Sequence, residues 1–179
     1  MIVAALLAIA LVTGRAAAQQ DTTRAGLETR LAQGDMAWDR EDHPAARAAY
    51  ELVVRADSTF STRALYRLGL LHAWDSKFDD ALSALRRYVR AEPADLAGRV
   101  ALARTYAWAS RFPASLAQYD TVLARDAGYR DAVIGKGQAL AWDNQLPQAE
   151  AHLERWLVAH ADDVEAWSLR IVVESSMPR

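Results

Sequence analysis

The chain repeats one pattern at a nearly constant interval. The dipeptide Ala-Trp occurs four times, with its tryptophans at positions 38, 74, 108 and 142, so that the last two intervals are equal. Residues 62–95, 96–129 and 130–163 are copies of identical length that follow one another without a gap. A fixed period of about 20 to 50 residues is the signature of repeat architectures. We therefore expect a stack of similar units.

Each copy contains two apolar stretches with helical spacing. In residues 62–95 their apolar faces are formed by Leu65, Leu68, Gly69 and His72, and then by Ala81, Leu85 and Tyr88. Spacings of three and four residues indicate helices rather than strands. A short break at 75–77, 109–111 or 143–145 precedes the second stretch, which then carries Pro113 or Pro147 in two copies. Because proline is tolerated in the first turn of a helix, each copy predicts helix, tight turn, helix.

These copies resemble the tetratricopeptide repeat, whose motif runs roughly W-x2-L-G-x2-Y, A-x3-F and P. Matching positions include Leu65, Leu68, Gly69, Ala81, Leu85 and Pro93, then Leu102, Ala103, Tyr106, Ser115 and Tyr119, and then Val133, Gly137, Leu140, Ala149 and Leu153. The resemblance implies an all-α, right-handed superhelical solenoid of antiparallel helix pairs. Residues 19–61 are expected to be a degenerate first repeat with an N-terminal lead-in.

Residues 164–179 are expected to form one capping or truncated helix. Trp167 and Ile171 fit a helix that packs on the preceding unit. Leu169, Val172 and Val173 are then expected to leave extra apolar surface, which a partner or a continuation of the chain would cover.

Residues 1–18 are predicted to be a signal peptide. Residues 2–12 are apolar over a length too short to span a membrane, and Ala16-Ala17-Ala18 offers a cleavage site; the alternative is a buried first helix. The endings Tyr106-Ala107-Trp108 and Leu140-Ala141-Trp142 also resemble periplasmic repeat segments of bacterial outer-membrane and exopolysaccharide-export proteins of the YaiO type. This resemblance implies an exported protein that is periplasmic or associated with the outer membrane. Its partner would be a protein or peptide, such as an outer-membrane barrel or an envelope assembly.

The recurring tryptophans share a helix face with polar residues. At about 100° per residue, Trp74 lies on the face of Arg63 and Arg67, Trp108 on that of Arg104, and Trp142 on that of Asp131 and Gln138. In tetratricopeptide-type arrays this face lines the concave groove, where such arrays usually bind ligands. The candidate ligand-binding residues are therefore Trp38, Trp74, Trp108, Trp142, Arg63, Arg67, Arg104 and Gln138. Alternatively, each indole folds over the following turn and has a structural role.

Composition argues against several other functions. A net charge of −2 without a clustered basic face gives no indication of nucleic-acid binding, and the absence of cysteine excludes disulfides and thiolate metal sites. The four histidines are scattered without metal-motif spacing, and His72 is expected to be buried. We find no catalytic set, expect no cofactor, and expect membrane contact only through the signal peptide. The sequence thus predicts a non-enzymatic scaffold for protein–protein interaction in the bacterial envelope. The alternative is a polysaccharide-binding or export accessory module that uses the tryptophan row.

Overall fold

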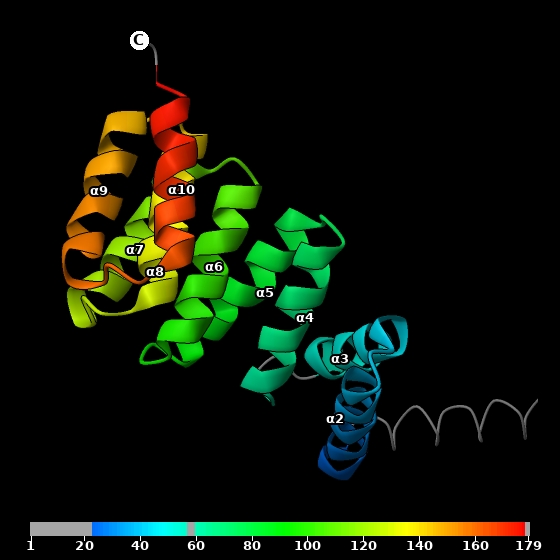
Figure 1. Cartoon of the computed structure of the whole chain (residues 1–179). Coiled ribbons are helices and arrows are strands. Elements are labelled where there is room, and N and C mark those ends of the chain that lie inside the picture. The colour runs from blue at the N-terminus through cyan, green and yellow to red at the C-terminus, as the bar shows by residue number, and fades with distance from the viewer. Residues whose placement is uncertain (1–22, 57–59, 178–179) are drawn as a thin grey trace, which may run out of the picture. The chain divides into compact units, whose positions relative to one another are not determined.

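The computed structural model describes residues 23–56 and 60–177, and in these ranges every regular element is an α-helix. The nine helices there are α2 (Arg24–Asp39), α3 (His43–Ala56), α4 (Thr62–Trp74), α5 (Phe78–Ala91), α6 (Leu96–Trp108), α7 (Phe112–Arg125), α8 (Arg130–Trp142), α9 (Leu146–Ala159) and α10 (Val164–Ser175) (Figure 1). The expected all-α fold of antiparallel helix pairs is confirmed. The proposed signal peptide, residues 1–18, lies outside the described residues. Among the described helices, none has the length and apolar character needed to cross a membrane.

The helix pairs recur with the period of the sequence. Helices α4, α6 and α8 begin at residues 62, 96 and 130, and their second helices begin at 78, 112 and 146. The tight turn inside each pair contains one residue with a left-handed backbone, Glu41, Ser76, Ser110 or Asn144, with φ between 55° and 60°. The next amide then bonds back to the first helix, as Arg111 N does to the Tyr106 carbonyl at 2.8 Å. This motif reverses the chain and ends the first helix at the tryptophan in α4, α6 and α8, and one residue after it in α2.

The chain divides into two compact units, residues up to Leu71 and residues from His72 onward. The first contains α2, α3 and most of α4. Its core consists of Ala46, Tyr50, Val53, Ala64, Leu68 and Leu71. A Cβ atom on Gly34 would lie only 2.7 Å from the Tyr50 ring, so the glycine allows α2 and α3 to pack closely.

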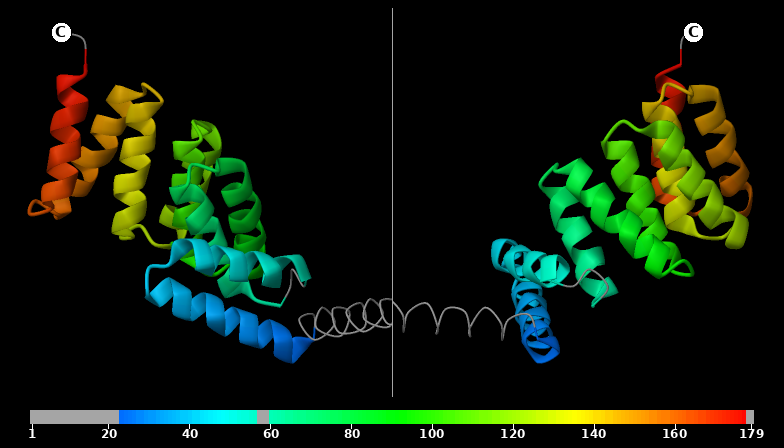
Figure 2. Two further views of the ribbon diagram at one scale, coloured as in Figure 1. Left: turned by 90° about the vertical axis from the view of Figure 1, so that its right-hand side faces the viewer. Right: turned by 180° about the vertical axis from the view of Figure 1, so that it is seen from behind.

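The second unit continues with α5 to α10 in two layers (Figure 2). The first helices of successive pairs, α6, α8 and α10, contact one another in that order, and α7 and α9 pack against them. Small residues permit this packing: the buried Ser115 hydroxyl donates to the Ala103 carbonyl at 2.8 Å, and Gly137 faces Leu153.

The orientation of α10 differs from the sequence-based prediction. The sequence predicts that Leu169 and Val173 are exposed, but they are buried in the core shared with α8 and α9, whereas Ile171 is largely exposed and Trp167 is partly exposed. The reason is the start of the helix. Asp163 caps α10, and residues three, six and ten positions after it then face the core. Val172 remains exposed, as predicted.

Candidate functional site

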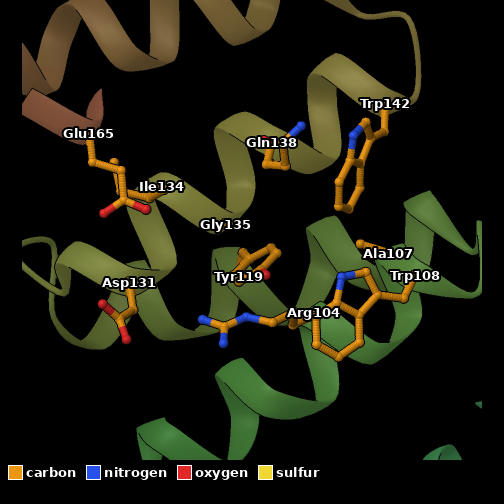
Figure 3. A pocket seen from close by; sticks show the side chains of 10 residues that line it. All are labelled: Arg104, Ala107, Trp108, Tyr119, Asp131, Ile134, Gly135, Gln138, Trp142 and Glu165. Carbon is orange, nitrogen blue, oxygen red and sulfur yellow. The ribbon is translucent and has the colours of Figure 1, made fainter. Parts of the chain in front are cut away.

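A pocket of about 370 Å³ opens between α6 and α8 of the second unit (Figure 3). Four of the predicted ligand-binding residues line it: Arg104, Trp108, Gln138 and Trp142. Tyr119 of α7 and Gly135 of α8 also line it, and Asp131 and Glu165 add two carboxylates. The pocket thus combines aromatic faces, a guanidinium, an amide and two carboxylates.

The two indoles of the pocket are accessible. Trp108 and Trp142 are the last residues of α6 and α8, and they are 38% and 49% exposed. Figure 3 shows both rings facing the same pocket. An indole placed in this way has an apolar face for contact with a ligand and an N–H for a hydrogen bond.

Tyr119 is the most deeply buried side chain of the pocket. Its ring comes from α7, and a Cβ atom on Gly135 would collide with its hydroxyl oxygen. Glycine at position 135 therefore makes room for the phenol. Burial raises the pKa of Tyr119 to about 12, although the charge of Arg104 acts in the opposite direction. The phenol is thus neutral at physiological pH, and its proton is available to a hydrogen-bond acceptor.

Arg104 carries a charge that no neighbouring carboxylate neutralises. Among the described residues, no carboxylate lies within 4.0 Å of its guanidinium, whose charge acts on the Tyr119 phenol. Of the two carboxylates in the pocket, that of Glu165 is 2.9 Å from Arg130 Nη2. Asp131 is solvent-exposed and has no ion-pair partner among the described residues.

The first unit contains a related cluster whose charges are paired. The Tyr50 hydroxyl donates to Asp35 Oδ1 at 2.9 Å and accepts from Arg67 Nη1 at 2.9 Å. Arg67 Nη1 also bonds to Asp35 Oδ1 at 2.8 Å, and the Arg67 guanidinium lies 4.9 Å from the centroid of the Trp38 ring. Arg63 Nη2 is 3.2 Å from Asp35 Oδ2. Asp35 therefore joins Arg63 and Arg67, and the Trp38 ring packs on the Arg67 guanidinium.

The candidate residues predicted from helix phase to share one groove thus come together only in part. Trp108, Trp142, Arg104 and Gln138 come together in one pocket, while Trp38, Arg63 and Arg67 form the paired cluster of the first unit. Trp74 is exposed at the end of α4 and does not line the pocket. Helix phase alone misses Tyr119, Gly135 and Asp35 as site residues. A glycine inside a helix, at a position that faces an aromatic residue, was the one available signal.

The histidines show no sign of a metal centre. His72 is buried, as predicted, and His152 Nε2 lies 2.9 Å from the Val133 carbonyl oxygen. Within residues 23–56 and 60–177, no three His, Asp or Glu side chains are arranged to hold a metal ion.

Helix pairs repeated at a constant interval define a helical-repeat protein. Two tetratricopeptide repeat models match residues 31–96 and 109–170, together more than half of the chain. The chain belongs to the tetratricopeptide repeat family. No curated protein matches it by sequence.

Solved structures support the same fold. YrrB, described as "a TPR protein with an unusual peptide-binding site", has 22% identity and a TM-score of 0.73, covering 92% of this chain and 87% of that one. A tetratricopeptide repeat protein from Parabacteroides merdae has 17% identity and a TM-score of 0.72 over 83% of this chain, which spans only 59% of that protein. A Thermobaculum terrenum O-GlcNAc transferase mutant has 20% identity and a TM-score of 0.63 over 75% of this chain and 26% of that one. At these identities the likeness establishes the fold alone.

Proposed function

We propose that the protein is a non-enzymatic scaffold that binds an extended segment of a protein partner in the pocket between α6 and α8. The observation that carries this proposal is the presence of two half-exposed indoles and an unneutralised guanidinium in one pocket. Tryptophan and arginine are the residues most enriched among those that dominate the binding energy of protein interfaces. The peptide-binding site named for YrrB, a protein of the same fold, is consistent with this role.

The size of the pocket suits one or two side chains. Its volume of about 370 Å³ is at the lower end of the range of about 300–1,000 Å³ that is typical of ligand pockets. A folded domain could not enter it, whereas an extended chain could insert single side chains between Trp108 and Trp142. The rest of the segment would then cross the neighbouring first helices.

Selection from a display library of random twelve-residue peptides against the full chain tests this proposal. Trp108→Ala and Trp142→Ala should each weaken a selected peptide by about tenfold or more, as expected for central interface residues. Trp167→Ala is the matched control, because Trp167 is 39% exposed but lies outside the pocket. If no peptide is enriched, or if Trp167→Ala weakens binding as much as the pocket variants do, the proposal is wrong.

A polysaccharide ligand is the second candidate. The faces of Trp108 and Trp142 could stack on sugar rings, and the amide of Gln138 and the carboxylate of Asp131 could bond to hydroxyl groups. A glycan array probed with the purified protein tests this alternative. Glycan binding that is lost in Trp108→Ala with unchanged helix content would favour it over the peptide.

We further propose that the protein acts in the bacterial envelope after export, with an outer-membrane barrel or an envelope assembly as its partner. The apolar run at 2–12 and the small residues at 16–18 support this proposal. Expression of the full chain with a C-terminal tag in a Gram-negative host tests it. A periplasmic product that begins at Gln19 by mass spectrometry is expected, and an uncleaved product in the cytosol would contradict it.

A further inference from the structure

We infer that the pocket between α6 and α8 recognises an acidic side chain, aspartate or glutamate, of the bound segment. This inference rests on the proposed peptide-binding function and specifies its ligand. The first unit provides the starting point, because there the protein itself places a carboxylate on a tyrosine and an arginine.

The two buried tyrosines occupy the same position of their helices. Tyr50 follows the first residue of α3, His43, by seven positions, and Tyr119 follows the first residue of α7, Phe112, by seven positions. Both side chains are almost fully buried. The Tyr50 hydroxyl accepts from Arg67 Nη1 at 2.9 Å, and Tyr119 shares its pocket with Arg104, whose charge lowers the pKa of the phenol. The two clusters therefore share a phenol–guanidinium pair.

In the first unit a carboxylate completes this pair. Asp35 Oδ1 accepts from the Tyr50 hydroxyl at 2.9 Å and from Arg67 Nη1 at 2.8 Å, so one oxygen receives two hydrogen bonds. The Trp38 ring, 4.9 Å from the Arg67 guanidinium, adds a cation–π contact. This arrangement shows which chemical group satisfies a phenol and a guanidinium beside an indole in this protein.

In the second unit the corresponding carboxylate is missing from the first helices. Asp35 precedes Glu41, the left-handed residue of its turn, by six residues, and the residue six before the equivalent Ser110 is Arg104. Among the described residues no carboxylate comes within 4.0 Å of Arg104. Arg104 thus stands in the place of Asp35, and a carboxylate that pairs with it has to come from an outside group.

Gly135 is a second difference between the two clusters. Arg67 precedes Trp74 by seven residues, and Gly135 precedes Trp142 by seven, so the two occupy the same helix position. Arg67 reaches the phenol from the helix that follows Tyr50 in sequence, whereas Arg104 reaches Tyr119 from the helix that precedes it. Gly135 has no side chain, so no group at this position of α8 takes the part that Arg67 plays in the first unit.

The positive charge of Arg104 favours the binding of a carboxylate in the pocket, and the negative charge of Asp131 opposes it. Charge-assisted hydrogen bonds from a guanidinium are among the strongest that a carboxylate accepts. The Glu165 carboxylate is paired with Arg130 at 2.9 Å, so its effect is reduced. Asp131 is unpaired among the described residues and would repel an acidic ligand, which makes Asp131 an independent test of the inference.

Peptides selected from the display library are the ligands with which this inference is tested. We expect enriched sequences to share an aspartate or glutamate, and replacing that residue by asparagine or glutamine should weaken binding by about tenfold, the effect of losing one hydrogen bond to a charged group. Arg104→Gln should cause a similar loss, and the peptide substitution should then have no further effect. Asp131→Asn should strengthen the acidic peptide severalfold and leave its amide analogue unchanged.

Arg111→Gln is the matched control, because Arg111 pairs with Asp79 outside the pocket. It removes a charge from the same unit and should leave peptide affinity unchanged. The gain expected for Asp131→Asn cannot arise from a loss of folding, so it keeps the test decisive even if Arg104→Gln is destabilised.

The outcomes separate this inference from the proposed function. Peptides whose binding depends on Trp108 and Trp142 but not on an acidic residue would overturn the inference and leave the peptide-binding function intact. Enrichment of no peptide would overturn both. Binding that disappears when only the C-terminus of the peptide is amidated would assign the carboxylate to the chain end and contradict a side chain. Binding of oligogalacturonate that depends on Arg104, without peptide binding, would replace the acidic peptide by an acidic polysaccharide.

Discussion

Arg130 and Asp163 are joined by two hydrogen bonds, from Arg130 Nη2 to Asp163 Oδ1 at 2.8 Å and from Arg130 Nε to Asp163 Oδ2 at 2.9 Å. The same carboxylate accepts from the Trp156 indole N–H at 2.9 Å and from the Ala166 amide at 3.1 Å. The Asp163 side chain is only 6% exposed. One carboxylate therefore links α8, α9 and the first turn of α10.

Asp163→Ala should lower the free energy of unfolding by about 1–2 kcal/mol, because the helix cap is lost and its donors lose their acceptor. Asp163→Asn should lower it less, since an asparagine can still cap α10. Urea denaturation followed by circular dichroism measures both. Asp162→Ala, at the exposed neighbouring position, is the control and should have no effect beyond experimental error. Equal effects at 162 and 163 would contradict the assignment.

The same carboxylate should make stability depend on acid pH. Hydrogen bonds from Arg130, together with those from Trp156 and Ala166, hold the pKa of Asp163 well below its usual range, despite partial burial. The unfolded chain, with a pKa of about 3.9 for aspartate, therefore binds this proton first. The contribution of Asp163 should be fully present above pH ~5 and decline as the pH falls towards the folded-state pKa. In urea titrations from pH 6 to pH 3, wild type should lose more stability than Asp163→Asn. Parallel pH profiles would exclude this role.

Gly135→Ala should destabilise the second unit, although glycine to alanine inside a helix ordinarily stabilises by up to about 1 kcal/mol. The added Cβ collides with the Tyr119 hydroxyl, and overpacking of this kind costs about 1–3 kcal/mol. Thermal unfolding should give a lower Tm. At Gly128, an exposed glycine in the loop between α7 and α8, the nearest atom to an added Cβ is Asp126 Oδ1 at 3.3 Å, so Gly128→Ala should change the Tm little. An unchanged Tm for Gly135→Ala would mean that the Tyr119 ring shifts freely.

Ser110→Gly should stabilise the protein. Ser110 has a φ of 55°, and a left-handed backbone costs a residue with a side chain roughly 1 kcal/mol relative to glycine. Ser83→Gly, at an exposed position inside α5, should have the opposite effect, since glycine weakens a helix interior by about 0.5–1 kcal/mol. Differential scanning calorimetry of the two variants distinguishes the sites. A lower Tm for both would indicate that the turn gains nothing from glycine.

The fold could be predicted from the sequence because the apolar residues recur with a regular period. The positions of Leu68, Ala81 and Leu85 indicate the buried faces of a helix pair without any neighbour, because the spacing of three and four residues is a property of one helix. Phase also brought Trp108, Trp142, Arg104 and Gln138 to one side of their helices, and the pocket contains all four. Whether that pocket binds a ligand stays a prediction.

Pairing between helices could not be predicted in the same way. Asp35 meets Arg67 across 32 positions of sequence, and nothing in the helix phase of either residue indicates that contact. Helix phase therefore gives no sign that Arg67 is already engaged by Asp35 and the Trp38 ring. The misassigned face of α10 has a similar cause: Asp163 fixes where the helix begins, and a shift in its rotation exchanges Leu169 for Ile171.

The phenol of Tyr119 packs against Gly135 and is almost fully buried, so the base of the pocket is rigid before any partner arrives. The entropy lost on association would then fall mainly on the incoming segment. A partner whose segment is already extended, or one constrained by cyclisation, should dissociate more slowly than a flexible one with the same side chains.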